Sequence, residues 1–211
     1  MNRLLLATLF ALPLLGLYPS AVSAQDAETS EWHASVGGGT VIPIAPLKFE
    51  GFHITGFSLN GSVAGLVNKW LSAGLFVSYM QFPHTGKALS FKDRLVRCID
   101  GGTKSFFSFG MTLRGELYEL AHYRLYASVD AGLTEMSRSK ATYSMNGMAE
   151  GMAMYAPAAS VTNEYVAGVI GIEYRINYQL GAAIEAGYGL GSDGVISNQF
   201  VPVRVLGKIR L

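Results

Sequence analysis

The sequence has very little cysteine, almost no net charge and, beyond its first 24 residues, no long uninterrupted apolar run. Its single cysteine, Cys98, excludes an internal disulfide framework. The formal net charge of +1 argues against nucleic-acid binding, which calls for a basic face. No later stretch approaches the roughly 18 apolar residues of a membrane-spanning helix. The sequence therefore indicates neither a disulfide-held fold nor a helical membrane protein.

The first 24 residues are typical of a secretory signal peptide. Arg3 supplies the positive charge, residues 4–18 form a short apolar run interrupted by Pro13, and Val22-Ser23-Ala24 forms a small-residue cleavage site. No cysteine follows that site, which argues against a lipoprotein anchor. We expect an exported chain whose mature domain covers residues 25–211.

The strongest pattern in the rest of the chain is an alternation with period two. The full sequence contains 25 glycines and 50% hydrophobic residues. In residues 105–118, every second residue from Phe107 to Leu117 is apolar or small. The residues between them, from Ser108 to Glu116, are polar or small. The same alternation is clear in 123–134, 164–176, 178–190 and 201–211, and fainter in 32–42, 54–67 and 70–82. A tilted membrane strand needs about 9–11 residues, whereas soluble strands average about 5–6. Eight segments of this length favour a membrane-spanning barrel.

The connections between these segments alternate strictly between short and long. The short ones are 68–69, 119–122 and 177, and the long ones are roughly 43–53, 83–104, 137–163 and 191–200. Short periplasmic turns and long outer loops are typical of up-and-down membrane barrels, and this arrangement places both termini in the periplasm. The predicted fold is all-β: an eight-stranded antiparallel up-and-down transmembrane β-barrel.

Aromatic residues on the outward parity fall at both ends of several strands. Those beside the short turns are Trp32, Tyr123, Tyr174 and Tyr178, and those beside the long loops are Phe57, Tyr79, Phe107 and Tyr188. Amphipathic rings settle at membrane–water boundaries, so two belts are expected. Aromatics are also common in strands generally, which is the alternative explanation.

The polar parity carries charges that cannot face lipid, where Arg or Lys at the midplane costs roughly 2–4 kcal/mol. We therefore expect a salt-bridged network inside the barrel, formed by Arg114, Glu116, Arg124, Asp130, Glu173, Arg175, Glu185, Arg204, Lys208 and Arg210. We expect Arg114, Glu116 and Asp130 near mid-barrel, and Glu173, Arg175, Arg124, Lys208 and Arg210 toward the periplasm. Structural pairing is the preferred interpretation. A gated path for small ions is the alternative, and paired carboxylates as catalysts lack a substrate-sized cleft.

The strand pattern and Gly-aromatic pairs such as GVIGIEYRI and AAIEAGYGLG resemble the small outer-membrane β-barrels of Gram-negative bacteria. The chain is similar to the OmpA transmembrane domain and its opacity-type and porin-family relatives over essentially the whole mature length. The resemblance implies the cell outer membrane as location, with lipid, lipopolysaccharide and the barrel-assembly machinery as partners. Such barrels usually end in an aromatic residue, whereas Leu211 is apolar but not aromatic. The chain stops at the barrel, so we do not expect the cell-wall tethering of full-length OmpA proteins.

Some small barrels of this membrane are lipid A deacylases or palmitoyltransferases, so an enzyme must be considered. Hydrolysis needs a serine, a histidine and an acid together at the lipid-facing rim. The sole close His-x-Ser is His33-Ala34-Ser35, which points inward by parity, and neither His53 nor His84 has a suitable serine and acid nearby. We therefore expect no enzyme, no cofactor and no metal site.

Two outer loops carry further chemistry. The third contains Met145, Met148, Met152 and Met154, which could bind Cu(I) but fit loop packing or hydrophobic contact better. The second is basic through Lys87, Lys92, Arg94, Arg97 and Lys104, against Asp93 and Asp100. These cations could meet lipopolysaccharide phosphates, or the loop could simply be solvated. Cys98 lies in the same loop, as a free thiol or a link to another chain.

The function expected from the sequence is structural or interactive, carried by a monomeric or weakly associated barrel and its outer loops. The alternative is a narrow channel or a carrier of small hydrophobic solutes. A soluble lipocalin-like barrel would need an apolar inward face, and here that face carries the charges.

Overall fold

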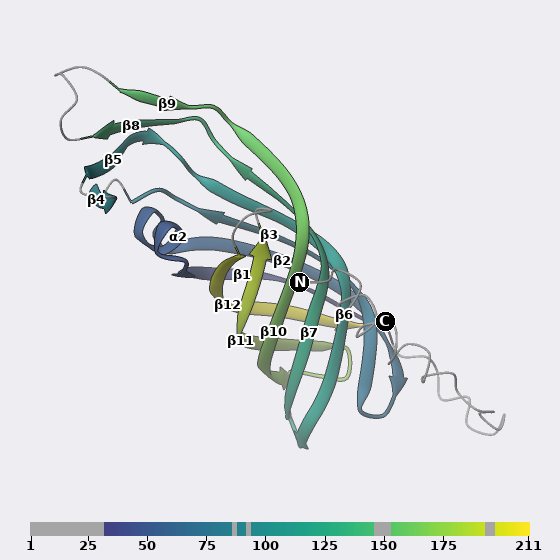
Figure 1. The fold of residues 1–211 in the computed structure, drawn as a ribbon. Helices are drawn as coiled ribbons and strands as arrows, with labels where there is room; N and C mark the ends of the chain where they lie inside the picture. Colours follow the sequence, from purple (N-terminus) through teal and green to yellow (C-terminus); the bar gives the residue numbers. More distant parts are fainter. Residues whose placement is uncertain (1–31, 86–87, 92–93, 146–152, 193–196) are drawn as a thin grey trace. The chain divides into compact units, whose positions relative to one another are not determined.

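Eight antiparallel strands of the chain close into a barrel in the computed structural model (Figure 1). The structure describes residues 32–85, 88–91, 94–145, 153–192 and 197–211, so the predicted signal peptide lies outside it. Around the barrel the strand order is β1-β12-β11-β10-β7-β6-β3-β2. The bounds are β1 Trp32–Ala45, β2 Gly56–Asn68, β3 Leu71–Phe82, β6 Lys104–Leu120, β7 Tyr123–Arg138, β10 Ala159–Arg175, β11 Leu180–Ser192 and β12 Ser197–Arg210. The predicted fold class is confirmed.

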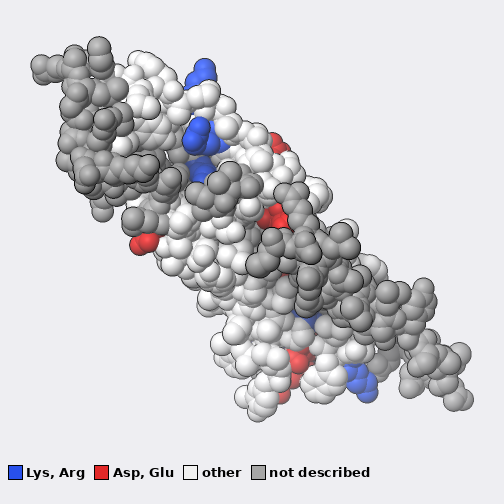
Figure 2. Space-filling view, in the orientation of Figure 1, with Lys and Arg blue, Asp and Glu red and all other residues white. Residues whose placement is uncertain are grey.

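The outward parity of the barrel strands is apolar and exposed, as the alternation predicts. Val36 is 70% exposed, Leu75 66% and Ile184 63%. Figure 2 shows a face on which most of the described surface carries no charge. So many apolar side chains on the outer surface of the barrel indicate that this surface faces the hydrocarbon of a membrane, because soluble proteins rarely expose large apolar patches. Among the described residues, no helix has the length and apolar character to cross a membrane.

The outward aromatics lie at both ends of the barrel wall. Trp32, Tyr123, Tyr174 and Tyr178 are exposed beside the short connections, which we call the turn end. Phe57, Phe107 and Tyr188 are exposed toward the opposite end, called the loop end, while Tyr79 is half-buried with its ring 5.8 Å from that of Phe57. This arrangement matches the two interfacial belts of membrane barrels.

Two of the connections predicted as long loops contain regular structure. They form a four-stranded sheet of β4 Ala88–Phe91, β5 Arg94–Gly101, β8 Ala141–Met145 and β9 Met154–Ala156, in the order β4-β5-β8-β9. The sheet continues the barrel wall, because Thr103 and Ser139 join the β6–β7 ladder to the β5–β8 ladder. Another long connection contains the short helix α2, Leu47–Phe52.

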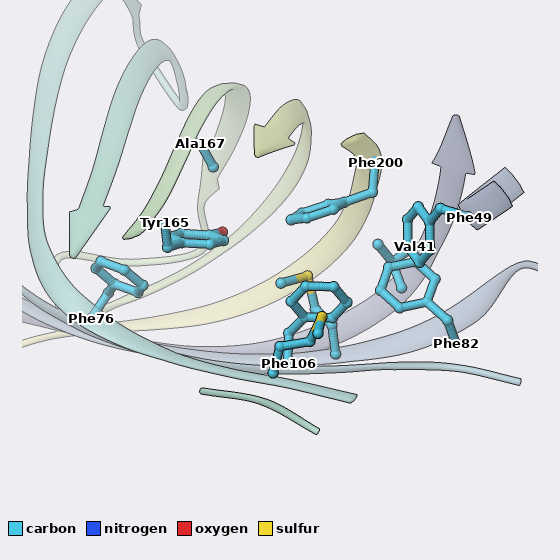
Figure 3. Close-up of a cluster of buried hydrophobic side chains, with 10 residues drawn as sticks. Val41, Phe49, Phe76, Phe82, Phe106, Tyr165, Ala167 and Phe200 are labelled. Atoms are coloured by element: carbon cyan, nitrogen blue, oxygen red, sulfur yellow. The ribbon is translucent and has the colours of Figure 1, made fainter. Parts of the chain in front are cut away.

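The interior is divided along the barrel axis. Toward the loop end it is filled by an apolar cluster made of Val41, Phe49, Phe76, Met80, Phe82, Phe106, Met136, Tyr165, Ala167 and Phe200. Figure 3 shows the rings of Phe82, Phe106 and Phe200 close together, with Phe49 of α2 beside them. The ring centroids of Phe49 and Phe82 are 4.8 Å apart, and those of Phe106 and Phe200 are 5.9 Å apart. Among the described residues, the ion pairs of the interior lie outside this apolar part, a division that the polar-parity interpretation did not predict.

Candidate functional site: the barrel lumen and its outer rim

The turn end of the lumen holds a cluster of alternating charges from β6, β7 and β10. The Arg124 guanidinium donates hydrogen bonds to Glu116 and to Glu119, and Arg175 donates to the same Glu119 carboxylate. Arg175 also donates to the Ala121 carbonyl at 2.9 Å. Glu119 pairs with Arg124 in the strand register, so the sheet itself brings these opposite charges together. We call this the turn-end cluster.

Deeper in the lumen, one carboxylate holds two cations from different strands. Glu173 Oε2 of β10 accepts from Arg114 Nη2 of β6 at 2.5 Å and from Lys208 Nζ of β12 at 3.2 Å. Both cations lie over the ring of Tyr126, Arg114 at 3.6 Å and Lys208 at 3.9 Å from its centroid. The Tyr126 hydroxyl in turn donates to Glu185 Oε1 at 2.5 Å. Tyr126 therefore connects this central cluster to the next one.

The third cluster centres on Arg204 of β12. Its Nη2 lies 3.5 Å from Glu185 Oε2 and 4.0 Å from Asp130 Oδ2. Glu185 faces Arg204 directly in the β11–β12 register. All three side chains are less than a tenth exposed, so mutual neutralisation is what makes their burial tolerable.

The structure brings nine of the ten charges singled out from the sequence into ion pairs, and Arg210 forms no ion pair with the described residues. The pairing differs from the expected grouping, because Arg114 joins Glu173 and Lys208 whereas Glu116 joins Arg124 near the turn end. Sequence reasoning missed Glu119, whose inward position depends on a register shift between Glu116 and Tyr118. It also missed the connecting role of Tyr126, although the parity of this residue in the sequence indicates that it points inward.

The lumen contains two small cavities, each of about 30 Å³. One opens at the turn end and is lined by Trp32, His33 and Arg210 among others, and the second lies deeper, beside Ser35, Asp130 and Tyr126. A cavity of this size has room for about two water molecules. Neither offers a cleft for a substrate of ordinary size.

The loop end is closed by α2 and its neighbours. Phe49 is 2% exposed, and the Lys104 ammonium lies 5.1 Å from its ring centroid while donating to the buried Asn198 Oδ1 at 3.0 Å. The ring of His53 contacts the carbonyls of Phe49 at 3.0 Å and Gly102 at 3.2 Å. Burial lowers the pKa of His53 to about 4, and the nearby Lys104 acts in the same direction. The neutral imidazole carries one N–H, so it lies between the two carbonyls and donates to one of them.

The remaining residues singled out from the sequence lie outside this lumen network or outside the described part. Lys87, Lys92, Met148 and Met152 lie outside the described residues, whereas Arg94 and Arg97 belong to β5 and Met145 to β8. Lys104 points at the lumen side of the rim, and Met154 is exposed on β9. The Ser35 hydroxyl bonds to Ser62 Oγ at 2.7 Å. The described residues contain no group of three or more His, Cys, Asp or Glu side chains suited to a metal.

Comparison with known proteins places this architecture. Residues 10–205 match the family described as "Outer membrane protein beta-barrel domain". No curated protein sequence matches the chain. Among solved structures, the chain is similar to Neisserial surface protein A (NspA), with a TM-score of 0.56 and 12% identity over 87% of this chain and 98% of that one.

Two further solved structures are similar at lower scores. The outer membrane protein OprG from Pseudomonas aeruginosa gives a TM-score of 0.47 with 10% identity, covering 87% of this chain and 96% of that one. The outer membrane protease OmpT from Escherichia coli gives a TM-score of 0.47 with 9% identity, covering 90% of this chain and all (100%) of that one. With a family match over most of its length and a closed eight-stranded barrel, this chain belongs to the outer-membrane β-barrel domain family and is an outer-membrane protein.

Proposed function

We propose that this protein is a non-catalytic, monomeric barrel whose lumen is a rigid, closed support and whose outer sheet is a contact surface outside the cell. The single observation that carries this proposal is the continuous ribbon formed by residues 94–120 and 123–145. The lumen clusters and the apolar cluster fill the support, and the sheet β4-β5-β8-β9 extends its wall at the loop end.

The length of the ribbon supports an outward projection. From Tyr123 to Met145 the strand path covers about 75 Å at about 3.3 Å per residue. A tilted strand needs about 9–11 residues to cross the hydrocarbon, so more than half of the ribbon lies beyond it. Because short turns face the periplasm in this class of barrel, the projecting part faces the outside.

The sheet also carries exposed side chains suited to contact. Tyr155 is 81% exposed and Met154 48% exposed on β9, and Lys140 is exposed where β7 passes into β8. Arg94 and Arg97 belong to the same sheet, so phosphates of neighbouring lipopolysaccharide are a fitting partner. Insertion would pass through the barrel-assembly machinery, as in other barrels of this architecture.

A variant without the sheet tests this proposal. Residues 86–101 and 141–156 are each replaced by a short Gly-Ser turn, which the pairing of Phe82 with Lys104 and of Arg138 with Ala159 allows. The matched control replaces residues 193–196 with the same turn. Cells carrying each form at equal outer-membrane level are tested for retention on lipopolysaccharide-coated beads and for aggregation with one another. A tenfold loss in the first variant alone supports the proposal, and equal behaviour of both variants overturns it.

A narrow channel is the second candidate, favoured by the two cavities in the charged part of the lumen. Planar-bilayer recording of the purified barrel separates the two. The proposed closed support predicts no steady conductance. Steady conductance that shifts on Arg114→Gln would favour the channel. A lipid A modification assay on membranes with and without the protein tests the remaining enzymatic possibility.

A further inference from the structure

The cavity at the turn end is lined by an excess of positive charge. Its walls carry five cationic side chains and two carboxylates: Arg114, Arg124, Arg175, Lys208 and Arg210, with Glu116 and Glu173. Glu119, just outside the lining, is already shared between Arg124 and Arg175. The protein's own carboxylates therefore do not balance the cations around this cavity.

The hydrogen-bond donors show the same excess. Each of the four arginines that line the cavity keeps one buried N–H without a partner among the described residues: Arg114 Nε, Arg124 Nε, Arg175 Nε and Arg210 Nη2. Arg210 also forms no ion pair there, unlike the other four cations. A buried donor without an acceptor costs about 1–3 kcal/mol, and more when it is charged. These four donors belong to residues that surround one small space, so an acceptor of negative charge bound there would satisfy those that face it.

The size of the cavity restricts what that acceptor is. About 30 Å³ accommodates roughly two water molecules, which is enough for one monatomic anion. A tetrahedral oxyanion would have to displace the lining side chains, and several of these are fixed by ion pairs. Trp32, Leu66 and Leu180 add apolar atoms to the lining, which lowers the local polarity and strengthens the attraction of the guanidinium groups for an anion.

We propose that the turn-end cavity binds one small halide ion, chloride under physiological conditions, held by the guanidinium of Arg210 and its arginine neighbours. The site is separate from the outer sheet and does not depend on the contact function proposed above. The bound anion offsets the surplus charge at this mouth and so completes the electrostatic balance of the lumen.

The test uses the refolded full barrel in detergent micelles and follows chloride and bromide. Saturable broadening of the chloride NMR line is measured in sodium gluconate of constant ionic strength, and bromide is added as the competitor. Crystals grown in sodium bromide give the position of the ion by anomalous scattering. The variant is Arg210→Gln, and the control is Lys140→Gln at an exposed cation near the loop end.

We expect saturable chloride binding in the unmodified barrel and in Lys140→Gln, at least tenfold weaker binding in Arg210→Gln, and a bromide peak within the turn-end cavity. Absence of saturable binding in the unmodified barrel, or equal binding by both variants, overturns the proposal. If Arg210→Gln does not reach the folded, heat-modifiable form, the bromide position in the unmodified barrel decides. A peak in the cavity supports the site, and no peak there overturns it.

Discussion

Replacing Glu173 by glutamine tests whether the charged part of the lumen holds the barrel together. The Glu173 carboxylate is the shared partner of Arg114 and Lys208, and its side chain is only 6% exposed. Glutamine keeps the size and one oxygen acceptor but removes the negative charge. Both cations then stay buried over the Tyr126 ring without their carboxylate.

The expected loss in unfolding free energy is about 3–5 kcal/mol, the usual cost of removing one partner from a buried ion pair. This corresponds to about two to four orders of magnitude in the folding equilibrium constant. The matched control is Glu119→Gln. The Glu119 side chain is 43% exposed, so screening limits its loss to about 1 kcal/mol or less despite its two arginine partners.

The assay is urea unfolding of the barrel in lipid vesicles, followed by tryptophan fluorescence and by heat-modifiable gel mobility. If Glu173→Gln unfolds at the same urea concentration as Glu119→Gln, the buried clusters do not provide the stability assigned to them. Adding Arg114→Gln to Glu173→Gln removes one of the stranded cations. The double variant should therefore be less destabilised than the sum of the two single changes.

Three further predictions concern other parts of the barrel. Gly171→Ala should cost about 1–3 kcal/mol of unfolding free energy, because its new Cβ would lie 2.6 Å from the Tyr126 hydroxyl. The control Gly168→Ala should cost little, because nothing lies within 4 Å of its new Cβ. Phe49→Ala should cost about 3–5 kcal/mol in the same urea assay by leaving a void in the apolar cluster. In an NMR titration, His53 should take up its proton near pH 4, and stability should be complete above about pH 6.5 and fall as the pH drops toward 4, since the unfolded histidine binds the proton first.

Each of these three predictions has a result that would contradict it. Equal stability of the Gly171 and Gly168 variants would place both residues on the same kind of surface. Phe52→Ala, in the same helix but half-buried, is the control for Phe49→Ala and should cost less. A His53 midpoint near 6.5 would mean that α2 does not bury the ring.

The eight barrel strands could be predicted from the sequence because period-two alternation sets the side of every residue at once. The same parity identified the inward charges, and the expectation that opposite charges pair followed from the cost of burial. The partners could not be predicted, because Arg114, Glu173 and Lys208 come from three strands whose relative stagger depends on closure of the barrel. The position of Glu119 could not be predicted, because the register shift between Glu116 and Tyr118 reverses its parity.

The apolar cluster and the outer sheet could not be predicted from the alternation either, for different reasons. Phe106 and Phe200 occupy the inward parity, but they lie close to or beyond the ends of the predicted strands. The sheet strands are short, with three to eight residues each, and their pairing depends on ladders extended from the barrel. Sequence alternation over so few residues is too weak to distinguish a strand from a loop.

The central claim is that alternate residues of each strand face lipid on one side and a closed lumen on the other. Nuclear Overhauser contacts between methyl-labelled side chains and lipid acyl chains in nanodiscs test it directly. The account predicts acyl-chain contacts for Ile184 and Val205, which are 63% and 59% exposed, and none for Leu206 and Val169, which are 2% and 3% exposed. Acyl-chain contacts at Leu206 or Val169, with none at Ile184 and Val205, would contradict it.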